Sequence, residues 1–389
     1  MGVVARGRGS MLFDLRPKES RSDLYDREDV LEGLERSLSR GDPLILVLGL
    51  RRYGKTSVLK VFLNECKCPF VYLDCRDIFL VEYPRIEDVA SIFSRSIRRL
   101  LDRYRGLSSK IKSFVRDIEE LSTPVVSLRF REKVTRFSYS LFELIDCLDE
   151  WACSRGLRAI LAFDEAQYLG KVIGVDFRKF FARIYDNNRN ITVVLTGSEI
   201  GLLQEFLRVE DSSSPLYGRY VKEIVLKPFT YEQSVDFLEK GFSEMKISIP
   251  HTIVREIVAR VDGVVGWLTY YGKMVSEYYL QGVNVGLREL DEVQRKAQNL
   301  ALEELRKLLS FRRSRRYFTI LKTIALLGSA TWSQVKRGVE LYEGRRVSDP
   351  TITDLLKTLL KLSIIAKDSE NRYYIIDPVL KKALLDAFT

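Results

Sequence analysis

Two short stretches of the chain carry residue types that can hold a phosphate and a divalent metal. The first, residues 49–56, has the spacing G-x-x-x-x-G-K-[ST]. Its glycines, Gly49 and Gly54, let successive backbone N–H groups converge on phosphate oxygens. Lys55 can then neutralise the β and γ phosphates, and the Thr56 hydroxyl can complete a Mg²⁺ shell. The other candidate nucleotide contacts in this stretch are Arg52, Tyr53 and Ser57.

The residues on either side of this loop predict the elements that such a loop needs. The apolar run 44–48 predicts a buried parallel strand, and residues 57–64 have helical spacing. A phosphate held there also meets the positive end of a helix. A chance Gly-Lys-Thr in an ordinary loop needs neither element, so the context favours a nucleotide-binding loop.

The second stretch, residues 157–165, is another apolar strand, and it ends in two carboxylates. A site of this kind needs an acid at a strand tip to hold the water shell of Mg²⁺, and Asp164 fits that position. Glu165 follows where a general base can polarise the attacking water. Acids often cap strands simply because water solvates them. Together with the loop at Gly49, however, the pair predicts ATP or GTP binding and hydrolysis.

Composition sets the class of protein. The chain has 389 residues, which predicts two or three domains, and 46% hydrophobic with 30% charged residues is typical of a globular protein. No apolar run approaches the roughly 20 residues that span a bilayer, and residues 1–10 do not resemble a secretory signal. We therefore expect a cytoplasmic protein that does not act in a membrane. The five cysteines are expected to be reduced thiols, although Cys66 and Cys68 are also spaced like a metal or redox pair.

The positive charge is concentrated at one end. The net charge is +10, and residues 305–389 hold 17 Lys or Arg against 8 Asp or Glu, which gives that segment +9. A basic C-terminal module thus follows a nearly neutral body.

The order of predicted elements indicates an α/β core. Strands alternate with helical patterns, which predicts a parallel sheet sandwiched by helices. The stretch 105–137 is polar and reads as an insertion that the pattern does not place. The predicted strands are 44–49, 69–74, 158–164, 192–197 and 221–226. The predicted helices are 22–40, 56–65, 86–104, 138–154, 176–188 and 200–208.

Two further modules follow the core in the predicted domain order. A disordered or extended tail covers 1–20 and the nucleotide-binding core covers 21–229. An all-helical lid covers 230–305, and a winged helix-turn-helix domain covers 306–389. The last domain is predicted from helices at 317–327, after Thr331 and at 350–362, and from a hairpin formed by 364–367 and 372–376.

On these motifs the chain resembles the archaeal P-loop ATPase family of the AAA+/STAND group with a C-terminal winged helix. The similarity runs from about Asp23 to the C-terminus. It is carried by residues 24–28, 49–57, 163–167, 195–198, 214–219 and 266–268. The resemblance implies a P-loop NTPase fold (AAA+-like) with ATP or ADP and Mg²⁺ as cofactors, Thr56 and Asp164 being the metal ligands.

The resemblance also implies roles for residues outside the two motifs. Tyr25 and Arg27 lie in a segment expected against the adenine, and Gly266 follows a lid turn that commonly contacts it. At 263–265 this chain departs from the family pattern, because the turn lacks the usual proline. Thr196 and Ser198 are expected as polar sensors of the γ-phosphate or the water, or else they simply end a strand. Arg219 is either a phosphate-reading arginine or a surface ion-pair partner.

Two classes of function remain open at this stage. The leading hypothesis is an ATPase that acts as a conformational switch and moves a basic domain. The competing class is a small-molecule phosphotransferase. For residues 306–389, double-stranded DNA is the favoured partner, with the helix 350–362 as groove reader. A protein partner, an autoinhibitory contact and a homo-oligomer also remain open.

Overall fold

The computed structural model describes residues 12–79, 84–104, 113, 116, 130–310, 312 and 314–387. The chain divides into two compact units. The core unit consists of Arg27–Leu50 and Lys55–Leu226. The lid–wing unit consists of Met1–Asp26, Arg51–Gly54 and Lys227–Thr389, and therefore includes the middle of the predicted phosphate loop. Most of the predicted insertion 105–137 lies outside the described residues.

The core unit is built on one five-stranded parallel sheet in the order β2-β3-β4-β1-β5. β1, β3 and β4 are buried along their whole lengths, as expected of parallel strands that are covered on both faces. All five predicted strands are confirmed, with ends that differ by at most one residue. Their bounds are β1 Leu44–Leu48, β2 Phe70–Asp74, β3 Ala159–Asp164, β4 Ile191–Gly197 and β5 Lys222–Val225.

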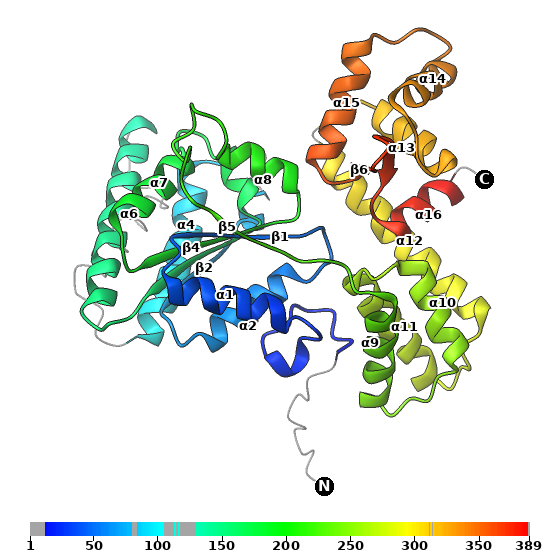
Figure 1. Cartoon of the computed structure of the whole chain (residues 1–389), viewed down its shortest axis with the longest axis horizontal. Coiled ribbons are helices and arrows are strands. Elements are labelled where there is room, and N and C mark those ends of the chain that lie inside the picture. The colour runs from blue at the N-terminus through cyan, green and yellow to red at the C-terminus, as the bar shows by residue number, and fades with distance from the viewer. Residues whose placement is uncertain are drawn as a thin grey trace. The chain divides into compact units, whose positions relative to one another are not determined.

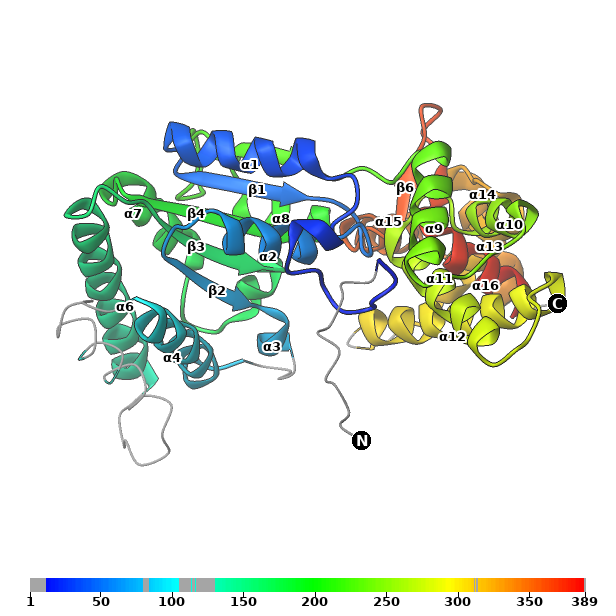
Figure 2. The same cartoon turned by 90° about the horizontal axis from the view of Figure 1, so that it is seen from below.

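Helices cover both faces of this sheet (Figure 1). One face carries α1 (Glu28–Arg40) and α2 (Lys55–Glu65), and the other carries α4 (Ile86–Arg103), α6 (Phe130–Cys153) and α7 (Phe177–Asn187) (Figure 2). The alternating residues Leu44, Leu46 and Leu48 of β1 all belong to the core cluster on this second face. α6 begins eight residues before the predicted helix, and so includes the end of the predicted insertion. Shorter helices are α3 (Arg76–Phe79), α8 (Ile200–Leu207) and the 3-10 helix η2 (Ala166–Lys171).

In the lid–wing unit, α9 to α12 form the predicted helical lid. The N-terminal segment packs on this lid through Phe13. This residue is 1% exposed, and its ring packs against Phe237 and Phe242. A Cβ at Gly241 or Gly272 would lie 2.3 Å from the Phe13 ring, so both glycines make room for it. Part of the predicted tail 1–20 is therefore ordered, because its one aromatic residue fills the lid core. The bounds are η1 Arg21–Asp23, α9 Tyr231–Glu244, α10 His251–Val261, α11 Val265–Leu280 and α12 Leu287–Leu309.

The C-terminal domain has the three helices and the hairpin of a winged helix, as predicted. The sequence did not predict the final helix, α16 (Pro378–Asp386), which packs on α12 and α13. Trp267 of the lid donates its indole N–H to Asp377 (2.9 and 3.1 Å), and Gln298 of α12 donates to Asp386 (2.8 Å). Lid and winged helix are thus joined through α16. The other bounds are α13 Arg316–Leu327, α14 Trp332–Glu343, α15 Asp349–Lys361, β6 Ile365–Lys367 and β7 Tyr373–Ile375.

Among the described residues, none of the helices has both the length and the apolar character that crossing a membrane requires.

Candidate nucleotide site

The parallel sheet brings the polar ends of three strands to one edge. In the pairing of β2 with β3, Asp74 lies opposite Asp164, and in that of β3 with β4, Phe163 lies opposite Leu195. Asp164 and Thr196, each one residue further on, therefore meet at the carboxyl ends of neighbouring strands. Leu48, the last residue of β1 before the loop, lies opposite Gly197. Ligands of open α/β sheets bind at this edge.

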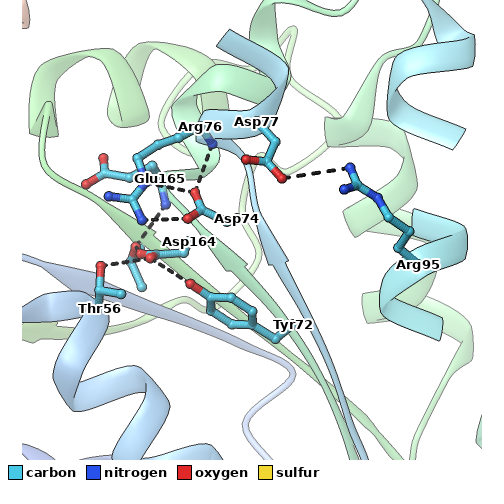
Figure 3. Close-up of polar contacts among 9 residues, drawn as sticks. Thr56, Tyr72, Asp74, Arg76, Asp77, Arg95, Asp164 and Glu165 are labelled. Carbon is cyan, nitrogen blue, oxygen red and sulfur yellow. Dashed lines mark hydrogen bonds and ion pairs between the residues drawn. The ribbon is translucent and has the colours of Figure 1, made fainter. Parts of the chain in front are cut away.

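Asp164 is the centre of a buried hydrogen-bond network at this edge. It is fully buried, and its Oδ2 accepts the hydroxyl protons of Thr56 (2.8 Å) and Tyr72 (3.1 Å) (Figure 3). Its Oδ1 accepts the hydroxyl proton of Thr196 at 2.5 Å. Burial raises the pKa of the Asp164 carboxyl, and the charge of Glu165 raises it further. Keeping the buried Asp164 carboxylate ionised therefore carries a desolvation cost.

Glu165 is held by a separate set of donors. Its Oε2 accepts from the Ser198 N–H (3.0 Å), the Ser198 hydroxyl (2.7 Å) and the Gln167 amide (2.7 Å). Burial alone would raise the pKa of Glu165, but the Lys55 charge and these hydrogen bonds outweigh it, so the pKa lies below its ordinary value. The backbone of Glu165 is left-handed (φ 55°), and its N–H donates to Thr196 (3.0 Å). A non-glycine residue in this region is strained, and such strain collects at functional sites.

The predicted phosphate loop leads from β1 into α2. Lys55 opens α2, is 4% exposed and donates from Nζ to the backbone carbonyl of Leu50 (2.9 Å). A buried ammonium needs such acceptors, and its charge acts on Glu165. A Cβ at Gly49 would lie 3.1 Å from Leu226 Cβ and 3.3 Å from its carbonyl oxygen, so this position has little room for a side chain.

The middle of the loop is tied to the lid. The carbonyl of Arg52 accepts the N–H of Gly266 (2.9 Å), and the Arg52 guanidinium lies 3.8 Å from the centre of the Trp267 ring. Its Nη2 donates to Glu304 Oε1 of α12 (2.5 Å). Arg52 has left-handed backbone (φ 68°), and a Cβ on Gly266 would lie 2.7 Å from that of Arg52. The predicted nucleotide residues Arg52 and Gly266 therefore contact each other, and Tyr53 between Arg52 and Gly54 is 8% exposed.

The other predicted nucleotide contacts, Tyr25, Arg27 and Ser57, are divided between the two units. Tyr25 packs its ring on Phe229 and Phe237 in the lid–wing unit, and its hydroxyl donates to Asp236. Arg27 is buried in the core unit, and Ser57 is partly buried on α2.

Arg219 is engaged in an ion pair. It donates to Asp186 of α7 through Nε (3.1 Å) and Nη2 (2.6 Å), and its Nη1 bonds the carbonyl of Pro215. In this conformation its guanidinium serves the ion pair that the sequence left open as the alternative to phosphate reading.

Sequence reasoning missed three residues of the site. These are Tyr72 on Asp164, Gln167 on Glu165, and Arg76, which forms an ion pair with Asp74 (2.5 Å) beside them (Figure 3). A signal was present, because Asp74-Cys75-Arg76 directly follows a predicted strand, where the carboxyl edge of a sheet presents functional groups.

The residues present fit a magnesium ion. Magnesium prefers hard oxygen ligands and keeps several waters, so one or two protein oxygens suffice. The Thr56 hydroxyl and the Asp164 carboxylate lie 2.8 Å apart and provide such oxygens. A dication would also offset the charge of Asp164 and Glu165, which burial makes costly.

Comparison with known proteins places this geometry in a family. The sequence profile of a family described as an ATPase domain predominantly from Archaea matches residues 24–270. A second profile, described as the C-terminal winged helix-turn-helix domain of MCM proteins, matches residues 312–376.

Solved structures and a curated relative are also similar to this chain. The Walker-type ATPase PABY2304 of Pyrococcus abyssi is 35% identical, with a TM-score of 0.79 over 96% of this chain and 100% of that one. The ORC2 protein of Aeropyrum pernix shares the fold at 13% identity (TM-score 0.60, 97% and 98% covered). The uncharacterized protein MJECL04 of Methanocaldococcus jannaschii is 27% identical over 51% of this chain, and the match spans only 42% of its own length.

Proposed function

Because the chain belongs to the family of ATPase domains found predominantly in Archaea, we propose that it is a Mg²⁺-dependent ATPase that works as a conformational switch. Loop residues from Gly49 to Ser57 bind the triphosphate, and Lys55 neutralises it. Thr56 and Asp164 hold Mg²⁺, which supplies charge stabilisation at the phosphates. Glu165 orients the attacking water, and Ser198 and Thr196 position the two acids.

The observation that carries this proposal is a pair of neighbouring acids, Asp164 and Glu165, whose pKa values are shifted in opposite directions. Asp164 accepts from three hydroxyls, which suits a metal ligand. Glu165 stays ionised at neutral pH, because its pKa is lowered, so its carboxylate can accept a hydrogen bond from a water and orient it. The three hydrogen bonds on Glu165 Oε2 also mean that the carboxylate must give up a donor before it can contact a water through that oxygen.

The first experiment measures phosphate release from ATP with Mg²⁺ and with EDTA, and binding of ATP by calorimetry. Lys55→Ala should abolish or nearly abolish ATP binding, because a buried cation that meets the phosphates is removed. Lys60→Ala, a lysine further along the same helix, should bind like the wild type. ATP affinity unchanged in Lys55→Ala would contradict the assignment of the loop, and turnover coupled to a phosphorylated small molecule would favour a phosphotransferase.

The switch is supported by the contacts of Arg52. Its carbonyl, its guanidinium and its ion pair all engage α11 or α12, so a rearrangement of the loop around phosphate reaches the lid. The lid in turn holds the winged helix through Trp267 and Asp377. ATP and ADP should therefore give different Trp267 fluorescence, measured against a Trp267→Phe variant. Identical spectra with both nucleotides would remove the switch and leave the ATPase.

Double-stranded DNA is the proposed partner of the winged-helix domain. The match to an MCM winged helix and the basic segment support it. On α15, Lys357 is exposed and Thr351, Thr358 and Lys361 are half-buried, while Asp354 on the same helix is an exposed acid. Duplex affinity should fall steeply with salt, because each neutralised phosphate releases counterions. A flat salt response would favour a protein partner.

A further inference from the structure

Among the described residues, three copies of one local turn occur, and one of these three lies against a site acid. In each, an aspartate is followed two residues later by an arginine whose backbone N–H donates to the aspartate Oδ1 at 3.0 Å. The guanidinium then returns to the same carboxylate. The copies are Asp14-Leu15-Arg16, Asp74-Cys75-Arg76 and Asp176-Phe177-Arg178.

The copy at Asp74 sits at the tip of β2, beside the acid of β3. Asp74 lies opposite Asp164 in the sheet, and the N–H of Cys75 donates to the Asp164 carbonyl (2.9 Å). This backbone bond fixes the turn next to the proposed Mg²⁺ ligand. Figure 3 shows Arg76 among the labelled side chains of Asp74, Asp164 and Glu165. The charge of Asp164 acts on Arg76, whereas Arg178 and Arg16 respond to acids outside the site.

Asp74 holds the Arg76 guanidinium in place but does not use all of its hydrogen-bond donors. Asp74 accepts from Nε (2.8 Å) and Nη2 (2.5 Å), which leaves the donors of Nη1 for a further acceptor. The Arg76 side chain is 53% exposed, in contrast to 4% for Lys55. A guanidinium with one edge anchored on a carboxylate and another edge open can bind a phosphate oxygen at little entropic cost.

The charges at this edge favour a phosphate as that acceptor. Three carboxylates lie here, those of Asp74, Asp164 and Glu165. A magnesium ion held by Thr56 and Asp164 would offset part of their charge, and a phosphate bound to that ion would still need a cation on its open side. Arg76 is then the exposed cation on the β2 side of the site, opposite the side from which Lys55 enters.

We propose that Arg76 donates a hydrogen bond to the γ-phosphate of bound ATP from the same chain that supplies the phosphate loop, while Asp74 orients its guanidinium. This inference rests on the proposed ATPase function. It assigns the discrimination of ATP from ADP to the tip of β2, since ADP lacks the phosphate that Arg76 contacts.

The test compares the binding of a non-hydrolysable ATP analogue with that of ADP by calorimetry, both with Mg²⁺. Arg76→Ala should weaken the analogue by about 10- to 100-fold, the range for losing a hydrogen bond to a charged group, and ADP by less than about twofold. Arg178→Ala removes the same turn contacts away from the site and should change neither ligand. Arg76→Lys, which keeps the charge but loses the fork, should fall between wild type and Arg76→Ala.

The outcomes separate the two proposals. If Lys55→Ala loses both nucleotides and Arg76→Ala leaves the ratio of analogue to ADP affinity unchanged, the role of Arg76 is overturned and the ATPase stands. An equal loss of both ligands in Arg76→Ala and Arg76→Lys also overturns it, because that result marks a structural residue. If the wild type binds neither nucleotide, the proposed function fails, and Arg76 with it.

Discussion

The carboxyl edge of the core sheet and the outer face of α15 both carry polar residues, but they are held in different ways. At the sheet edge, Asp164 is fully buried and Glu165 is partly buried, and each accepts three hydrogen bonds. On α15, Lys357 is exposed, and Thr358 bonds only back to its own helix, at the Asp354 carbonyl (2.9 Å), among the contacts described. The polar side chains at the sheet edge are thus held by neighbouring residues, whereas those on α15 face solvent.

This difference predicts two kinds of response to substitution. Buried groups that depend on one another should show large, non-additive effects that salt hardly changes. Exposed cations should contribute small, similar increments that salt screens. The following variants test that contrast in order of expected effect.

The largest effect is expected from Glu165→Gln. The amide keeps the size of the side chain but cannot act as a base, so turnover should fall about 10²-fold or more while ATP binding is retained. Phosphate release and calorimetry measure the two quantities. Glu205→Gln on α8, an exposed glutamate, is the control. Wild-type turnover in Glu165→Gln would remove Glu165 from the role of base.

Asp164→Asn should lower the ATPase activity and raise the stability of the fold. Because burial raises the Asp164 pKa, the folded chain binds this proton more tightly than the unfolded chain, and ionisation destabilises the fold as pH rises above about 3.9. At pH 7 the ligand-free variant should therefore melt at a higher temperature than the wild type. The difference should shrink toward acid pH.

A matched control for Asp164→Asn has the opposite sign. The hydrogen bond from Arg183 lowers the pKa of Asp146, so its charge stabilises the fold above the unfolded pKa, and this is lost as pH falls. Asp146→Asn should consequently lower the melting temperature at pH 7. Equal signs for the two variants would contradict the contrast between an unpaired and a paired carboxylate.

Arg219→Ala decides between the two roles left open for this arginine. If the ion pair with Asp186 is its role, Arg219→Ala and Asp186→Ala should each cost about 0–1 kcal/mol and leave turnover unchanged. If Arg219 reads phosphate, only Arg219→Ala should slow hydrolysis, with little change in ADP affinity. Turnover and thermal melts of both variants provide the comparison.

The smallest effect is expected on α15. Lys357→Ala should weaken duplex binding modestly for any sequence and reduce the salt slope by about one, the share of a single phosphate contact. Lys273→Ala is the control, because that lysine of the lid is paired with Glu277 (2.7 Å). A slope that is identical in Lys357→Ala and the wild type would move the DNA surface away from this helix.

The sequence predicted what depends on local pattern. The five strands, the loop at Gly49 and the acids at the end of β3 follow from apolar runs and fixed spacing, and the structure has all of them. It did not predict α16, a nine-residue helix whose first residue is a proline and which gains its burial from α12. The helical reading therefore failed where stability comes from packing rather than from periodicity.

The same limit applies to the site. Tyr72 and Gln167 reach the acids across a strand or a turn, and no spacing in the sequence announces such contacts. The ring of Phe13 likewise packs on Phe237 and Phe242, which lie more than 200 positions away. Residues of this kind are recognised only once the sheet and the lid are folded.

The Glu304 contact has a mechanical consequence. Arg52 forms an ion pair with Glu304, near the C-terminal end of α12. This helix is 23 residues long, which corresponds to about 34 Å. The displacement of a rigid helix grows with distance from its pivot. Leu287 lies 17 residues from Glu304, about 26 Å along the axis, so a tilt of about 10° about Glu304 moves that end by roughly 4 Å. Since α16 packs on α12, where Gln298 donates to Asp386, a movement of α12 should also move the winged-helix domain.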